Sequence, residues 1–283
     1  MMNDNFDRFK ELYEHQWALN AGDDASKETP EFWDDKAFDF AAKAHSPEAR
    51  AESLEFLQRF CWKPEERVLD VAAGPGTFAI PLAGKVAHVT VTDFSAGMLD
   101  ELLKQAVIEK IDNLEVIRGR WLDIDFPGVF DTVLCLNSLG VVASDASHKP
   151  QLVKALCKLR DACAKRLIVL IPHADSPLDH NMRRILDLDE VAVERRRVAV
   201  IYCAMVDCGM LPNLEIISRP FRWTFTSIEE AAETLLRKAG VNSQSAVSGK
   251  FIDYLAACVN RDRNGRLSLA YNASQALYTW VRR

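Results

Sequence analysis

The stretch Val68–Ala83, VLDVAAGPGTFAIPLA, constrains the fold more than any other part of the chain. It reads as an apolar strand with a carboxylate at its end, then a turn with two glycines, then the start of a helix. Such a turn lets backbone approach a ligand closely and directs N–H groups at the start of a helix toward it. The stretch therefore predicts a nucleotide-like ligand at the carboxyl end of a parallel strand.

Strand and helix patterns alternate around this stretch. Parallel strands need crossover helices, so five such repeats with short connections predict a doubly wound α/β sheet with helices on both faces. The five predicted strands are Arg67–Val71, Ala87–Thr92, Leu114–Ile117, Phe130–Leu136 and Arg166–Ile171.

The flanking regions have different patterns. Residues 1–60 carry apolar side chains at helical spacing and are predicted to form an N-terminal helical cap on the core. Residues 61–283 are expected to form the ligand-binding domain, with a helical insertion at about 226–270. A helix is predicted over Asp187–Gly209, and Leu214–Phe225 reads as a strand or a strand pair with a break at Pro220.

Composition excludes several classes of function. A formal net charge of −6 provides no electrostatic footprint for nucleic acid or an anionic membrane. No apolar run is long enough to span a membrane, and the first residues do not resemble a signal peptide, so a cytoplasmic location is expected. The seven cysteines lack the spacing of metal ligands and are expected to be buried thiols, with no metal bound.

The acids on either side of the turn indicate the ligand. Asp93 ends the second strand, where its two oxygens suit the two hydroxyls of a ribose, and Phe94 offers a flat apolar surface to adenine. Asp70 would attract an ammonium group and repel a pyrophosphate. Gly74 and Gly76 would let the backbone meet this ligand, which reads as adenosine with a cationic, amino-acid-like arm.

A dinucleotide is the alternative ligand. Gly74–Ala79, GPGTFA, fits the pattern G-x-G-x-x-[GA], which also suits an NAD(P)-dependent oxidoreductase. The acid before the turn and the lack of a second nucleotide-binding half in the last third of the chain both disfavour that interpretation.

The sequence resembles the class I S-adenosylmethionine (SAM)-dependent methyltransferases. Asp70–Gly76, DVAAGPG, is similar to their first motif, D-x-G-x-G-x-G, with Ala72 in place of the first glycine, and Asp93 matches their ribose-binding acid. The resemblance implies seven strands in the order 3-2-1-4-5-7-6, with only the last antiparallel and Leu277–Arg282 as the seventh. The cofactor contacts that the turn chemistry and the resemblance together indicate are Asp70, Ala72, Ala73, Gly74, Gly76, Asp93, Phe94, Arg120, Trp121, Asn137 and Ser138.

The expected reaction is an in-line methyl transfer to N, O or S of a small organic acceptor. Such a transfer depends mainly on alignment and exclusion of water. A homodimer is a possible assembly. His173, after the fifth strand, is the candidate general base, with hydrogen bonding to loop backbone as the alternative. A non-catalytic SAM-binding protein is the third interpretation of the chain. Five aromatic residues are expected either to contact the acceptor or to pack the cap against the sheet. They are Tyr13, Trp17, Trp33, Tyr202 and Trp223.

Overall fold

The computed structural model describes residues 11, 13, 15, 29–125, 128–174, 178–188, 192–238, 241, 249–263 and 265–283. The described residues divide into two compact units. The first unit takes those of Met1–Ile171, Ala199–Glu215 and Leu277–Arg283, and the second takes those of Pro172–Val198 and Ile216–Ala276. The expected insertion at about 226–270 thus lies within one segment of the second unit, Ile216–Ala276.

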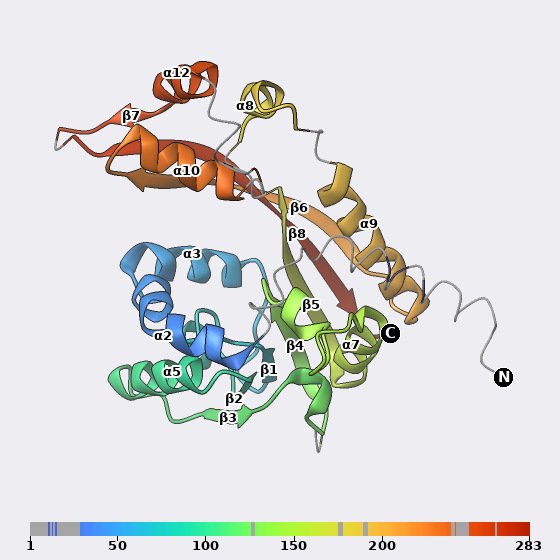
Figure 1. The fold of residues 1–283 in the computed structure, drawn as a ribbon. Helices are drawn as coiled ribbons and strands as arrows, with labels where there is room; N and C mark the ends of the chain where they lie inside the picture. The colour runs from blue at the N-terminus through green and yellow to red at the C-terminus, as the bar shows by residue number, and fades with distance from the viewer. Residues whose placement is uncertain are drawn as a thin grey trace. The chain divides into compact units, whose positions relative to one another are not determined.

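A mostly parallel sheet runs in the order β3-β2-β1-β4-β5-β8-β6, which confirms the predicted doubly wound fold (Figure 1). The pairs β1–β2, β1–β4, β2–β3 and β4–β5 are parallel, and a short additional strand, β7, pairs antiparallel with β8. The strands are β1 Arg67–Val71, β2 His88–Asp93, β3 Leu114–Arg118, β4 Phe130–Leu136, β5 Cys163–Ala174, β6 Asn213–Phe225, β7 Asn260–Arg261 and β8 Leu267–Val281.

The central strands are buried on both faces because their sequences are nearly continuous apolar runs. Val68 and Leu69 of β1, Val133 of β4 and Leu167 of β5 are fully buried. A register in which Asp70 of β1 pairs with Val91 of β2 brings the carboxyl ends of these two strands together.

Helices of the first unit cover the sheet and start at the residues that the sequence favours for capping. Thr29, Ser46 and Ser95 accept backbone N–H groups at the starts of α2, α3 and α5, and a proline follows at the first position of α2 and of α3. In Figure 1, α2 lies beside α5. These helices are α2 Pro30–Ala44, α3 Pro47–Gln58, α4 Ala79–Ala83, α5 Ala96–Ile108, η2 Trp121–Asp123, α6 Leu139–Val142 and α7 Leu152–Asp161.

The later helices are α8 His180–Ile185, α9 Ala192–Asp207, α10 Ile228–Lys238 and α12 Gly249–Cys258. The second unit has its own apolar core, in which Leu235, Phe251 and Leu255 are fully buried. Ser227 caps α10, since its Oγ accepts the N–H of Glu230 at 3.1 Å. None of the described helices has the length and apolar character needed to cross a membrane.

Three predicted boundaries were wrong. β6 runs through Pro220 without a break, because β6 is the last strand in the sheet order and an edge strand tolerates a missing N–H. β8 begins at Leu267 rather than Leu277, inside the segment expected to be helical, since its inward residues alternate with Ser, Asn and Gln that obscured the strand pattern. The helix predicted over Asp187–Gly209 is shorter, with α9 covering Ala192–Asp207.

Candidate cofactor site

The backbone N–H groups of the turn after β1 form hydrogen bonds within the protein. Ala73 donates to Thr92 O at 3.0 Å, and Gly76 donates to Ala73 O at 3.1 Å. Gly74 donates to the Asp93 carboxylate at 2.9 Å. Each of these three N–H groups is therefore satisfied within the protein, and contact between the turn and the ligand stays a prediction.

The two glycines of the turn are needed for different reasons. Gly74 has φ +57°, and a Cβ there would meet only Met98 Sδ, at 4.0 Å. Gly76 has φ +86°, and a Cβ would lie 2.8 Å from Ile80 and 3.0 Å from Leu102. Gly76 thus permits packing of the turn on α4 and α5, while Gly74 leaves open space over the backbone.

Asp93 connects the turn to the start of α5. Its Oδ2 accepts the N–H of Gly74 and its Oδ1 accepts the N–H of Ser95, both at 2.9 Å. Burial raises the pKa of Asp93, and its backbone hydrogen bonds oppose that rise. Each carboxylate oxygen can accept more than one hydrogen bond, so both retain capacity for a ribose hydroxyl.

Asp70 is a buried carboxyl group at the end of β1. Its side chain is 2% exposed, and its Oδ2 has no hydrogen-bond partner among the described residues. Burial, followed by repulsion from Asp93, raises the pKa of Asp70 to about 7. A buried carboxylate without a cation is costly, so this site suits a ligand that brings a positive charge.

Phe94 and Arg120 form a stacked pair beside Asp93. The guanidinium of Arg120 lies 4.9 Å from the centroid of the half-buried Phe94 ring. Trp121 instead belongs to the core: it is 3% exposed, its Nε1 donates to Ala155 O, and the Lys158 ammonium lies over its ring. The expected adenine surface can thus come from the Phe94–Arg120 pair but not from an open face of Trp121.

The residues after β4 lie against the end of β1. Ser138 Oγ donates to Val71 O at 3.2 Å, and the N–H of Asn137 donates to Leu170 O at 2.7 Å. Asn137 is exposed and has φ +60°, a conformation that asparagine tolerates better than most residues. The structure therefore brings together Asp70, the glycine turn, Asp93 and the Asn137–Ser138 segment at one edge of the sheet.

Asp34 of α2 and His45, the C-cap of α2, form hydrogen bonds at this end of the sheet. The sequence patterns did not identify either role. Asp34 accepts hydrogen bonds from Ser95 Oγ at 2.6 Å and from the N–H of Gly97 at 2.8 Å. In the tautomer with hydrogen on Nε2, His45 donates to Pro75 O at 2.9 Å. A Cβ on Gly97 would lie 3.1 Å from Ala37 and from the Asp34 backbone, so α2 packs closely on the start of α5.

The candidate catalytic and acceptor residues lie in several places. His173 is within β5 rather than in the loop after it, and it belongs to the second unit, as does Trp223, which packs edge-to-face with Phe225 and Tyr271. In the first unit, Trp33 packs edge-to-face on two rings of its own helix, and Tyr13 is hydrogen-bonded to Asp207. Tyr202 is half-buried on α9, and Trp17 lies outside the described residues. A shared acceptor site remains a prediction.

The comparisons with known proteins agree with this geometry. A family model described as a methyltransferase domain matches residues 68–163. Among curated proteins, the chain is 37% identical over 92 residues to an uncharacterized protein of Haemophilus influenzae, covering 32% of this chain and 34% of that protein. Over 92 residues it is 34% identical to a demethylmenaquinone methyltransferase of Clavibacter sepedonicus, covering 32% and 37% of the two chains. Over 69 residues it is 36% identical to a probable ribosomal RNA small subunit methyltransferase A of Methanosphaera stadtmanae, covering 24% and 25%. The matched segments thus span about a third or less of this chain and at most 37% of the relatives.

Solved structures show the same fold. A putative methyltransferase from Bacillus halodurans aligns with a TM-score of 0.50 at 16% identity, over 82% of this chain and 98% of that one. A putative methyltransferase from Haloferax volcanii, solved with the activator Trm112, aligns with a TM-score of 0.51 at 13% identity, over 88% and 96%. The fold is thus Rossmann-like. Residues 68–163 are similar to a methyltransferase domain of the class I SAM-dependent kind, whose cofactor is S-adenosylmethionine.

Replacing Asp93 should weaken the cofactor site. We expect Asp93→Ala to reduce the affinity for SAM by about 1–3 kcal/mol, because bonds to two hydroxyls and the anchor of Gly74 are lost together. Isothermal titration calorimetry measures this change. Asp39→Ala, at an exposed position on α2, is the matched control. Unchanged affinity in Asp93→Ala would refute the assignment of Asp93 to the ribose.

Ala72 has φ +54°, where a Cβ is strained. We expect Ala72→Gly to leave the free energy of unfolding unchanged or to raise it by up to about 1 kcal/mol, since relief of strain offsets the greater entropy of unfolded glycine. Ala73→Gly, at a position outside the left-handed region, should lower it by about 0.5–1 kcal/mol. Urea denaturation measures the free energy of unfolding of the two variants. An equal decrease in both would contradict the strain at Ala72.

Proposed function

We propose that the protein transfers a methyl group from SAM to a nitrogen, oxygen or sulfur atom of a small organic acceptor. The observation that carries the proposal is the buried carboxyl group of Asp70, whose Oδ2 lacks a partner among the described residues beside a turn anchored by Asp93. An adenosyl ligand with an ammonium group complements both acids. The match of residues 68–163 to a methyltransferase domain supports the same conclusion.

The residues of the site fit SAM by their chemistry. Asp70 would hold the positively charged amino group, and Asp93 would accept the ribose hydroxyls. Phe94, stacked with Arg120, would offer adenine a flat surface. Asn137 and Ser138 would line the side of the methionine portion.

The turn is poorly suited to a dinucleotide. A pyrophosphate is bound by free backbone N–H groups at such a turn, yet those of Ala73, Gly74 and Gly76 are already bonded within the protein. The Asp70 carboxylate would repel the phosphates as well. The NAD(P)-dependent alternative is therefore disfavoured.

The reaction requires positioning more than acid–base chemistry. Bound SAM supplies a methyl group on a positively charged sulfur that leaves as a neutral thioether. The protein must therefore align the acceptor and exclude water. An acceptor that arrives as an alcohol or thiol also needs a group that accepts its proton, and His173 is the residue proposed for that role.

Charge favours a small acceptor over RNA. The relatives include one named for ribosomal RNA and one for demethylmenaquinone, so their names permit both classes of acceptor. A net charge of −6 disfavours a polyanionic acceptor for the chain as a whole. We also propose a cytoplasmic location, where disulfides are rare, because no disulfide joins the described cysteines.

Methyl transfer from labelled SAM to a panel of acceptors tests the proposal. The panel contains amines, thiols and phenols, with ribosomal RNA as the competing class. We expect turnover of a small acceptor and none of RNA, and we expect the pH–rate profile of an alcohol or thiol acceptor to lose its lower limb in His173→Gln. SAM binding without transfer to any member would favour a non-catalytic SAM-binding protein, and transfer to RNA would overturn the acceptor class.

A further inference from the structure

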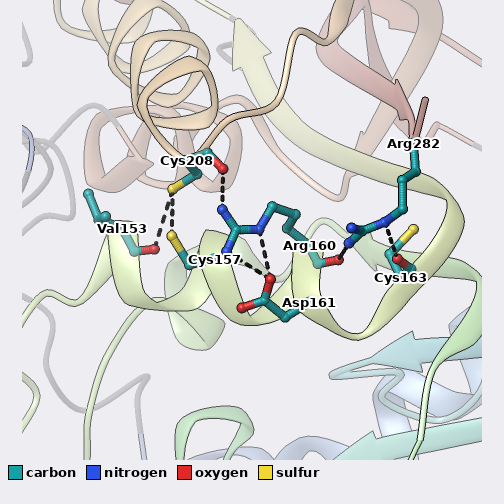
Figure 2. Close-up of polar contacts among 7 residues, drawn as sticks. All are labelled: Val153, Cys157, Arg160, Asp161, Cys163, Cys208 and Arg282. Atoms are coloured by element: carbon teal, nitrogen blue, oxygen red, sulfur yellow. Dashed lines mark hydrogen bonds and ion pairs between the residues drawn. The ribbon is translucent and has the colours of Figure 1, made fainter.

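Two thiols lie in contact at a place remote in sequence from the glycine turn. Cys157 is on α7 and Cys208 directly follows α9, and their Sγ atoms are 2.9 Å apart (Figure 2). A disulfide has an S–S distance of about 2.05 Å, so the sulfurs need to approach by only about 0.9 Å. Both residues belong to the first unit.

Neighbouring side chains hold this pair in place. Arg160 donates to the carbonyl of Cys208 and forms an ion pair with Asp161 (Figure 2). Arg282, after β8, donates to Cys163 O at 2.9 Å and to Arg160 O at 2.6 Å. The hydrogen bond from Arg160 thus connects the end of α7 to the residue that follows α9, and Arg282 binds the end of α7.

A cavity of about 490 Å³ borders Cys208, one member of the pair. Three arginines and one acid are among its lining residues, so its charge favours an anionic ligand. Cys208 is 2% exposed but lines this cavity, and Cys157 is half-buried. The lining residues are Arg160, Asp161, Cys208, Gly209, Leu211, Trp280, Val281, Arg282 and Arg283.

We propose that Cys157 and Cys208 form a reversible disulfide, and that an anionic low-molecular-weight disulfide such as oxidised glutathione is the oxidant. The Cys157 thiolate attacks one sulfur of the oxidant, so a mixed disulfide forms and one glutathione leaves as a thiolate. Cys208 loses its proton and attacks Cys157 Sγ, which breaks the mixed disulfide and releases the second glutathione. Two protein thiols are oxidised, and one oxidised glutathione is reduced to two glutathione molecules.

The surroundings favour this order of attack. The hydrogen bond with Cys157, followed by burial, raises the pKa of Cys208, so Cys208 keeps its proton and is suited to the second step. Cys157 is the more exposed sulfur, and the positive charge of Arg160 lies near both. Cys163, at the start of β5, has a fully buried side chain and serves as the unreactive comparison.

The test uses the full chain in buffers with graded ratios of reduced to oxidised glutathione. Free thiols are then alkylated, and the digested protein is analysed by mass spectrometry. We expect a peptide pair crosslinked through Cys157 and Cys208 that disappears on reduction, together with an upward shift of the melting temperature. Cys208→Ser should instead accumulate a glutathione adduct on Cys157, and Cys163→Ser should behave as the parent protein.

Two results would overturn the proposal. One is the absence of the crosslinked peptide in the parent protein at the most oxidising ratio. The other is a crosslink that pairs Cys157 or Cys208 with a different cysteine, such as the exposed Cys203. Because the crosslink is read in the parent protein, a variant that fails to fold does not affect either result.

Discussion

Gly74→Val should abolish measurable SAM binding while the protein still folds. Valine at φ +57° is strained by about 1–2 kcal/mol, and the turn would shift to relieve that strain. The shift would break the hydrogen bond from the N–H of Gly74 to Asp93, which would cost about 1–3 kcal/mol more. The new side chain would also occupy the open space over the backbone. The strain itself lowers stability with or without ligand, so the loss of affinity comes from the displaced turn and the filled space, and we expect it to exceed about 100-fold.

Gly84→Val is the matched control for this variant. Gly84 caps α4 with φ −73°, and a Cβ there meets no atom within 4 Å. Calorimetry should give near-parental SAM affinity for Gly84→Val and none for Gly74→Val, with similar circular dichroism spectra for both. Tight binding by Gly74→Val would show that the ligand does not approach this turn.

Asp70→Asn should make the protein more stable and its cofactor binding weaker. At pH 8 the folded protein holds a buried carboxylate at Asp70 near the charge of Asp93, and asparagine removes that cost. A shift of the pKa from 3.8 to about 7 corresponds to roughly 4 kcal/mol as an upper figure, so we expect a gain of about 2–4 kcal/mol in the free energy of unfolding. Loss of the negative charge should weaken SAM binding about 10- to 100-fold.

The sign of the pH dependence follows from the raised pKa. Between about pH 4 and pH 7 the folded state binds more protons at Asp70 than the unfolded state does. The contribution of Asp70 to stability is therefore present at low pH and is lost as pH rises through about 7. The extra stability of Asp70→Asn over the parent protein should therefore grow between about pH 4 and pH 7, and it should be absent near pH 4.

Lowering the pH should weaken SAM binding by the parent protein, although it increases the contribution of Asp70 to the stability of the fold. A cationic amino group favours the ionised form of Asp70, so affinity should fall as pH drops below about 7. Asp131→Asn is the control, because Asp131 accepts from the N–H of Arg67, pairs with Lys165 and has a lowered pKa. That variant should lose stability at pH 8. A higher free energy of unfolding in Asp131→Asn, or no increase in Asp70→Asn, would contradict the environments assigned to these two carboxyl groups.

Local patterns were sufficient to predict most of the sheet. β1 and β4 have the predicted bounds, Arg67–Val71 and Phe130–Leu136. These features depend on residues close together in the chain. Pro220 and the polar residues of β8 misled the prediction because their effect depends on sheet position, which is set by pairing between distant strands.

The parts of the site that sequence missed depend on long-range contacts. Asp34 binds the start of α5 across 61 residues, and His45 binds the glycine turn across 30. Neither belongs to a spacing pattern, so no local signal identifies it. The use of the turn's N–H groups by Asp93 is likewise visible only once β1 and β2 are paired.

Titration of the full chain with SAM and, separately, with NADH tests the central claim most directly. The anchored turn, the buried Asp70 and the Asp93 carboxylate predict saturable heat with SAM that is reduced in Asp93→Ala, and no heat with NADH. Binding of NADH without binding of SAM would contradict the account.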